Sequence, residues 1–138
     1  MHIFKEFGFE AAHQLPQDAE GTYGNCSRVH GHSYRFRVAI QGALTDKGWV
    51  MNFQTLSDIV KRTVIDQCDH RMLNDVYPNT IVTIENLALH WGRTIQAVLQ
   101  SEHPGIALHS IEAWETGKCG VVLEAADLQV SSTPSDGQ

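Results

Sequence analysis

Residues 33–42, SYRFRVAIQG, decide the fold, because their side chains alternate between polar and apolar with the two-residue period of a β-strand. Apolar side chains occupy every second position from Tyr34 to Ile40, and the positions between them are mostly polar. Residues 2–13, HIFKEFGFEAAH, alternate in part in the same way and predict an earlier strand that ends at or near His13. The two predicted strands, joined by a polar loop, indicate an antiparallel hairpin.

A first helix is predicted after this hairpin. Residues 49–53, WVMNF, are strand-like and lead into residues 54–68, QTLSDIVKRTVIDQC, where apolar side chains recur at helical spacing. Asn52 is suited to be the N-cap. The residues of the apolar stripe are Phe53, Leu56, Val60 and Val64.

A second helix is predicted from about Ile84 to Ser101, with Thr83 as its N-cap. Pro104 and Gly105 end it. Residues 69–80, DHRMLNDVYPNT, are polar, contain a proline and predict a loop between the two helices. Long loops of this kind often carry functional residues.

The last third of the chain predicts two more strands, at residues 106–116 and 119–125. The element order indicates one α+β domain over residues 1–126, a four-stranded antiparallel sheet with two helices on one face. Residues 127–138 are polar and predict a frayed tail. The apolar run Val121, Val122 and Leu123 suits burial on both sides, which favours an oligomer that closes the sheet.

The composition excludes several classes of protein. The formal net charge is −6, from 10 Lys and Arg against 16 Asp and Glu, which argues against binding to nucleic acid or to anionic membranes. No apolar run approaches the roughly 18 residues of a membrane helix, and the first residues lack the apolar core of a signal peptide. We therefore expect a cytoplasmic protein. The 3 cysteines are an odd number and predict reduced thiols.

Three histidines form a candidate metal site. His30 and His32 are two residues apart, so on a strand both imidazoles point to the same face. His13, at the end of the neighbouring strand, can lie beside them. A three-histidine set with an open fourth position is typical of catalytic zinc. Two alternatives remain: the pair is an ordinary surface or core feature, or Cys26 is a fourth ligand that makes a closed structural site.

Candidates for proton transfer lie near these ligands or on the predicted loop. A cation and Arg28 close to Cys26 favour its thiolate, which could act as a base, although a lone cysteine is more often inert. Asp69 can orient His70 as an acid-base pair, and the alternative is a helix end with a solvated histidine. Glu115, at a strand end, could accept the N–H groups of a flat heterocycle, or be an ordinary turn residue.

Six short motifs occur in an order that resembles one protein family. They are FGFEAAHQL (7–15), CSRVHGHSYRF (26–36), VMNF (50–53), CDHRMLND (68–75), TIENLA (83–88) and EAWET (112–116). Together they resemble the family of 6-pyruvoyl-tetrahydropterin and 6-carboxy-tetrahydropterin synthases. Departures from the family pattern, which puts Asp, Leu and Pro at these positions, occur at Asn52, Cys68 and Val82 and bear on loop geometry and fine substrate preference.

The resemblance implies the tunnelling fold, in which trimers close into a β-barrel and two trimers stack as a hexamer. It also implies one Zn²⁺ per subunit and active sites at subunit interfaces, where cysteine and Asp-His pair come from different subunits. The implied metal ligands are His13, His30 and His32, and the residues implied to transfer protons are Cys26, Asp69 and His70. Glu115 is implied to anchor the pterin ring, in a pocket lined by Thr83 and Glu85. The candidates for binding the triphosphate are Arg28, Arg35, Arg37 and Lys118.

The spacing C-x3-H-G-H, from Cys26 to His32, resembles the 6-carboxy branch of the family, which serves queuosine biosynthesis. That resemblance implies a zinc-dependent lyase that converts 7,8-dihydroneopterin triphosphate to 6-carboxy-5,6,7,8-tetrahydropterin, acetaldehyde and triphosphate. One alternative is the 6-pyruvoyl reaction, which eliminates triphosphate. The alternative from another class is a zinc-stabilised binding protein without catalytic activity.

Overall fold

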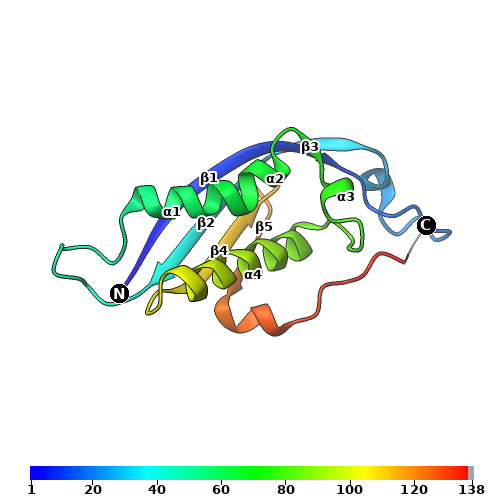
Figure 1. Cartoon of the computed structure of the whole chain (residues 1–138). Helices are drawn as coiled ribbons and strands as arrows, with labels where there is room; N and C mark the ends of the chain where they lie inside the picture. Colours follow the sequence, from blue (N-terminus) through cyan, green and yellow to red (C-terminus); the bar gives the residue numbers. More distant parts are fainter. Residues whose placement is uncertain (137–138) are drawn as a thin grey trace.

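A mostly antiparallel sheet of five strands, in the order β3-β1-β2-β4-β5, forms the framework of the computed structural model, which describes residues 1–136. The helices lie over one face of this sheet (Figure 1). The chain is α+β, as predicted. The elements are β1 (His2–His13), η1 (Gly24–Ser27), β2 (His30–Gln41), α1 (Phe53–Val60), η2 (Lys61–Ile65), α2 (Asp66–Cys68), β3 (Arg71–Met72), α3 (Leu73–Val76), α4 (Ile84–Glu102), β4 (Ala107–Trp114), β5 (Gly120–Glu124) and η3 (Ala125–Gln129).

The hairpin of β1 and β2 confirms the predicted antiparallel pair. Its register runs without interruption from His2 opposite Gln41 to His13 opposite His30. Strand β2 begins at His30, three residues before the predicted start, because residues 30–32 continue the ladder with β1. Odd-numbered positions of β1 and even-numbered positions of β2 therefore face the helices and the core.

The first predicted helix is confirmed as a continuous helical segment made of α1, η2 and α2, in which η2 is a π-helical turn. Asn52 caps it by accepting a hydrogen bond of 2.8 Å from the backbone N–H of Gln54. Two corrections apply. Residues 49–53 form no strand, and Phe53 is 51% exposed because it is the first residue of α1, whose buried residues begin only at Leu56. The other predicted stripe residues, Leu56, Val60 and Val64, are buried.

Helix α4 agrees with the prediction at both ends. Its bounds are Ile84–Glu102, and the Thr83 hydroxyl accepts a hydrogen bond of 3.3 Å from the N–H of Asn86. Its apolar side packs on β4 and β5, and Trp91 is fully buried there against Phe36. Through Asn86, this helix also holds the segment before it, residues 81–83.

Residues 69–80 are not the plain loop that their composition predicts. They contain β3, which pairs in parallel with β1 at Ala11 and Ala12, and the short helix α3. The side chain of Asn74 extends this pairing by a further step, accepting from the N–H of Gln14 at 3.0 Å and donating to its carbonyl at 2.9 Å. The sheet therefore has a fifth strand beyond the four predicted.

Residues 127–136 do not form the frayed tail that their polarity predicts. Leu128 is buried, and the chain continues past α4 to form a β-bridge between Pro134 and Thr80. The contacts come from side chains of α4 and from residues 78–81, which lie far away in the sequence and give the tail no local signal. Residues 137 and 138 of the predicted tail lie outside the described part of the chain.

The outward face of the sheet carries side chains that pair with one another. Arg37 bridges Glu6 at 2.9 Å and Glu112 at 3.2 Å on the neighbouring strands. Val122 of the edge strand β5 is 65% exposed, whereas Leu123 is buried, so burial on both sides of β5 is not achieved within one chain. Within residues 1–136, no helix combines the length and the apolar character that a membrane crossing requires.

Gly120 and Gly117 provide a matched test of the β4–β5 hairpin. A Cβ at Gly120 would lie 2.4 Å from the carbonyl oxygen of Ala113, whereas a Cβ at Gly117 would meet no atom within 4 Å. We expect Gly120→Ala to lower the free energy of unfolding by about 1–3 kcal/mol, the usual cost of overpacking, because the backbone of β4 must move. Gly117→Ala should leave it within about 0.5 kcal/mol. Urea unfolding of both variants measures the difference, and equal midpoints would contradict the prediction.

Candidate metal centre

Three histidines converge at the end of the β1–β2 hairpin. The register places His13 directly opposite His30, and His32 lies two residues further along β2 on the same face. Ligand atoms of the three side chains all lie within 4.8 Å of one another. The two Nε2 atoms of His13 and His30 are 3.0 Å apart. The predicted grouping of His13, His30 and His32 is therefore present in the fold.

Backbone carbonyls assign the tautomers of two of these imidazoles. The Nδ1–H of His13 donates to the carbonyl oxygen of Val82 at 2.8 Å, and the Nδ1–H of His30 donates to that of Arg28 at 2.7 Å. Since a neutral imidazole carries one N–H, both Nε2 atoms then present bare lone pairs to each other. Two facing lone pairs at this distance repel unless a cation lies between them.

The third imidazole points to the same conclusion. The Nε2 atom of His32 is buried and has no hydrogen-bond partner among residues 1–136. A buried polar atom without a partner is costly, and a metal ion would satisfy it together with the other two lone pairs. The donor set, three imidazole nitrogens with their outer nitrogens held by carbonyls in two cases, fits a borderline-soft divalent ion.

Burial keeps the imidazoles in the ligating form. It lowers the pKa of His13 to about 4, an effect that the hydrogen bond to Val82 opposes and that His30 and His32 reinforce. Burial also lowers the pKa of His32, with a further contribution from His30. Both side chains are therefore neutral near pH 7 and can each donate a lone pair to a metal.

Two further side chains border the histidine cluster. Glu115 follows the end of β4, with its Oε2 atom 4.0 Å from the Nε2 atom of His32. Burial raises the pKa of Glu115, and Glu85 raises it further, whereas His30 lowers it. Tyr34 lies below the cluster, its ring centroid 5.4 Å from that of His32, and its buried hydroxyl has no partner among the described residues. Burial, followed by the charge of Glu115, raises the pKa of Tyr34, so its hydroxyl stays protonated.

Sequence reasoning missed Tyr34 as a site residue. Its position was a usable signal, because it continues the spacing of His30 and His32 by two residues and must face the same way. The aromatic alternation of β2 explained Tyr34 as a core residue, which it also is, since it stacks on Phe9 with a ring-centroid distance of 5.3 Å.

Asp69 and His70 pair with each other at the edge of the sheet. The Nδ1 atom of His70 lies 2.9 Å from Oδ1 of Asp69, and the backbone of Glu10 holds both residues: its N–H donates to Asp69 at 3.1 Å and its carbonyl accepts from the N–H of His70 at 2.6 Å. His70 has a φ of 57°, the left-handed conformation that non-glycine residues rarely adopt. The Glu10 N–H, followed by His70, lowers the pKa of Asp69.

The Asp-His pair is not joined to the histidine cluster within one chain. His70 borders a hollow of about 550 Å³, whose walls include outward-facing positions of β1 and β2 such as Glu10 and Ser33, and also His32 of the cluster. Its side chain is 77% exposed, and no hydrogen bond or ion pair among residues 1–136 connects it to His13, His30 or His32.

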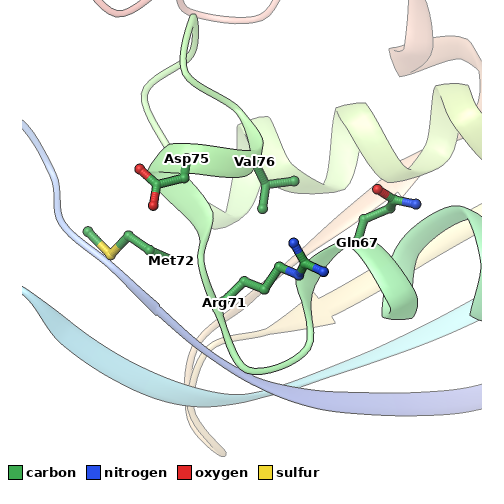
Figure 2. A pocket seen from close by; sticks show the side chains of 5 residues that line it. All are labelled: Gln67, Arg71, Met72, Asp75 and Val76. Carbon is green, nitrogen blue, oxygen red and sulfur yellow. The ribbon is translucent and has the colours of Figure 1, made fainter.

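Figure 2 shows a second hollow beside this pair, with a volume of about 420 Å³. Arg71 extends toward Gln67 across it, and Asp75 points away from the guanidinium. Arg71 also borders the hollow that contains His70. It is therefore a basic side chain next to the Asp-His pair, and sequence reasoning did not single it out.

The remaining predicted residues lie around the cluster. Cys26 is exposed in the short helix η1, and its carbonyl accepts from the N–H of Leu15 at 2.8 Å. Among the described residues its thiol does not belong to the group of mutually close ligand atoms, which argues against a closed site with Cys26 as a fourth ligand. Arg28 contributes its carbonyl to His30, Thr83 caps α4, and Glu85 lies in its first turn.

Comparison with known proteins agrees with this fold and cluster. The family model described as 6-pyruvoyl tetrahydropterin synthase matches residues 2–126. The 6-carboxy-5,6,7,8-tetrahydropterin synthase of Synechocystis sp. is 40% identical over 120 residues, which cover 83% of this chain and 85% of that protein. The 6-pyruvoyl tetrahydrobiopterin synthase of Dictyostelium discoideum is 35% identical over 91 residues, which cover 59% of this chain and 67% of that protein.

A solved structure extends the likeness to three dimensions. The 6-pyruvoyl tetrahydropterin synthase of Caenorhabditis elegans superposes with a TM-score of 0.80 at 26% identity, over 91% of this chain and 95% of that one. The family match over residues 2–126 and this superposition thus place the α+β chain in the pterin synthase class of enzymes. The chain belongs to the 6-pyruvoyl tetrahydropterin synthase family, which includes proteins named 6-carboxy-5,6,7,8-tetrahydropterin synthase.

The histidine cluster predicts tight metal binding that depends on His32. We expect His32→Ala to weaken Zn²⁺ binding by more than about 100-fold, because loss of a ligand exceeds the effect of losing an outer partner. His109→Ala is the matched control, since His109 stacks on His2 at 4.0 Å and lies outside the cluster. Competition with a chromophoric chelator measures both affinities. Equimolar, tightly held zinc in the His32→Ala protein would refute the assignment.

Proposed function

We propose that this chain is a zinc-dependent carbon-carbon lyase of the 6-carboxy branch, which converts 7,8-dihydroneopterin triphosphate to 6-carboxy-5,6,7,8-tetrahydropterin, acetaldehyde and triphosphate in queuosine biosynthesis. The observation that carries the proposal is the trio of buried or half-buried histidines whose ligand nitrogens converge beside Glu115. The spacing from Cys26 to His30 and His32 favours the 6-carboxy branch, as does the relative from Synechocystis sp..

His13, His30 and His32 would hold the metal, and the open side of the cluster would admit the substrate. When bound, Zn²⁺ supplies a Lewis acid that polarises a substrate oxygen, so that a proton on the adjacent carbon becomes more acidic. The pairing of His13 with Val82 and of His30 with Arg28 holds the rings in their ligating tautomers. This part of the site therefore needs little rearrangement.

Cys26 is the proposed base that removes a proton from the substrate side chain. It is exposed in a short helix whose following residues, Arg28 and His30, lead directly into the cluster. Its carbonyl anchors the loop to Leu15, two residues after His13, so that the loop containing the thiol is tied to both strands of the hairpin. A thiol off the metal but beside it can accept a proton without occupying the open coordination position.

Asp69 and His70 are the proposed second acid-base pair. Asp69 accepts the Nδ1–H of His70, which leaves the outer nitrogen of the ring free to exchange a proton with the substrate. Since this pair makes no hydrogen bond or ion pair with the cluster among residues 1–136, we propose that it acts on the site of a neighbouring subunit. The open edge at β5, with Val122 exposed, suits pairing with a neighbouring subunit. We propose that three subunits close into one barrel in this way and that two such trimers stack into a hexamer.

Glu115 is the proposed anchor for the pterin ring. Its carboxylate can accept two N–H groups of the flat heterocycle, and its half-buried position strengthens such bonds. Thr83 and Glu85, at the start of α4, are proposed to line the same pocket. The raised pKa of Glu115 is consistent with a carboxylate that is stabilised when donors arrive with the ligand.

The triphosphate requires cationic donors, and the candidates differ in whether their side chains already have partners in the fold. Both terminal nitrogens of Arg37 are occupied by Glu6 and Glu112, and Arg35 lies over the Trp114 ring at 4.4 Å. Arg28 and Lys118 have no ion-pair partner among residues 1–136 and remain proposed contacts. Arg71, next to the Asp-His pair, joins them as a contact to the substrate of the neighbouring subunit.

The reaction product separates this proposal from the 6-pyruvoyl alternative. Zinc-loaded protein incubated with 7,8-dihydroneopterin triphosphate should release acetaldehyde and 6-carboxytetrahydropterin in equal amounts, which chromatography and mass spectrometry of the pterin measure. A 6-pyruvoyl pterin as the main product would assign the chain to the other branch.

Substitution of Cys26 separates a catalytic thiol from a structural ligand. We expect Cys26→Ala to lower kcat by about 10²–10⁴, the usual contribution of an acid-base group, while zinc content and thermal stability stay unchanged. Cys119→Ala, at another exposed cysteine, should leave kcat unaltered. Loss of zinc together with unfolding in the Cys26→Ala protein would support the zinc-stabilised binding protein instead.

A further inference from the structure

The last described residues of the chain form a strap along α4. We define the C-terminal strap as residues 128–136, which run beside the helix toward the end of the sheet that carries the histidine cluster (Figure 1). The strap lies beyond residues 2–126, the part matched by the family model. None of its side chains belongs to the candidate site as described above.

Arg93 of α4 holds the first half of the strap. Its Nε–H donates to the carbonyl of Leu128 at 2.9 Å, one terminal nitrogen donates to the hydroxyl of Ser132 at 2.9 Å, and the other donates to the carbonyl of Val130. One guanidinium therefore joins three alternate residues of the strap to the helix. Such fork-like donation is geometrically specific and sets the path of the chain.

Asn86, two helical turns before Arg93, holds the second half. It is buried, its Oδ1 atom accepts from the N–H of Thr133 at 3.0 Å, and its Nδ2 donates to the carbonyl of Ile81 at 2.8 Å. The N–H of Ile81 in turn donates to the carbonyl of Thr133 at 3.2 Å. Asn86, Thr133 and Ile81 thus form a closed ring of hydrogen bonds, extended by the bridge between Thr80 and Pro134.

This ring of hydrogen bonds is adjacent in sequence to the carbonyl group that orients His13. Ile81 is followed by Val82, whose carbonyl accepts the Nδ1–H of His13 at 2.8 Å. Val82 does not belong to a helix or strand, so no regular ladder fixes the direction of its carbonyl. The bonds from Asn86 and Thr133 to Ile81 restrain this segment on one side, and the cap at Thr83 restrains it on the other. The N–H of Thr83 also donates to the carbonyl of Ile81 at 2.9 Å, and the side chain of Val82 is buried.

We propose that the C-terminal strap, acting through Asn86, positions the Val82 carbonyl and thereby holds His13 in its metal-binding tautomer. Asn86 and the backbone of Thr133 are positioning groups, since neither touches the metal or the substrate. Outer partners of this kind typically change metal affinity by about 10–100-fold. The inference rests on the proposed function in that it takes the histidine cluster to be a zinc site.

A pair of substitutions at Thr133 tests the proposal on the full chain. Thr133→Pro removes the N–H that Asn86 accepts, whereas Thr133→Ala keeps both backbone bonds and serves as the matched control. We expect Zn²⁺ affinity, measured by chelator competition, to fall by about tenfold or more in Thr133→Pro and to stay unchanged in Thr133→Ala. The d–d absorption of the Co²⁺-substituted proteins should change in the same variant only.

A chain that ends at Val130 is the second variant, because it removes Thr133 without adding a ring. It should reproduce the loss of zinc affinity, with far-UV circular dichroism of the metal-free protein showing that the fold is retained. Equal zinc affinities in the control, the proline variant and the shortened chain would overturn the positioning role and leave the proposed function intact. Failure of the unaltered protein to bind Zn²⁺ would overturn the proposed function, and this inference with it.

Discussion

The antiparallel register between β1 and β2 is the constraint on which the site depends. Because the side-chain period of a strand is two, a shift of one residue would move His13 to the opposite face from His30 and His32. The same register buries Phe9 and Tyr34 against Trp91, so the core and the ligand set are selected together. Hydrophobic burial along the hairpin therefore maintains the geometry of a polar cluster at its end.

Burying three imidazoles with their lone pairs facing one another costs free energy when no metal is bound. Several neighbouring groups hold the imidazoles in this arrangement. Desolvation holds His13 and His32 neutral, and carbonyls from Val82 and Arg28 orient two rings so that lone pairs face inward. These carbonyls belong to irregular segments, which need support of their own. The strap and Asn86 give that support on one side, and the β1–β2 pairing gives it on the other.

One face and one edge of the sheet carry different parts of the proposed chemistry. The helix side holds the histidines and Glu115, whereas the Asp-His pair lies at the β3 edge, where the backbone of Glu10 keeps His70 in a left-handed conformation. Backbone strain at a residue with an acid-base side chain persists only where surrounding bonds enforce it. An assembly that brings the β3 edge of one subunit to the histidine cluster of another would explain why the Asp-His pair and the cluster are each held by several hydrogen bonds but are not bonded to each other.

Local patterns in the sequence determined the strands β1 and β2, both helix caps at Asn52 and Thr83, and the grouping of three histidines, because alternation and capping act over only a few residues. Only the tertiary structure decided the pairing of β3 with β1 and the course of residues 127–136. Both depend on partners far along the chain: Glu10 for His70, and Asn86 with Arg93 for the strap. A short polar segment has no periodicity of its own, so its structure follows from the hydrogen-bonding groups that the rest of the fold presents to it.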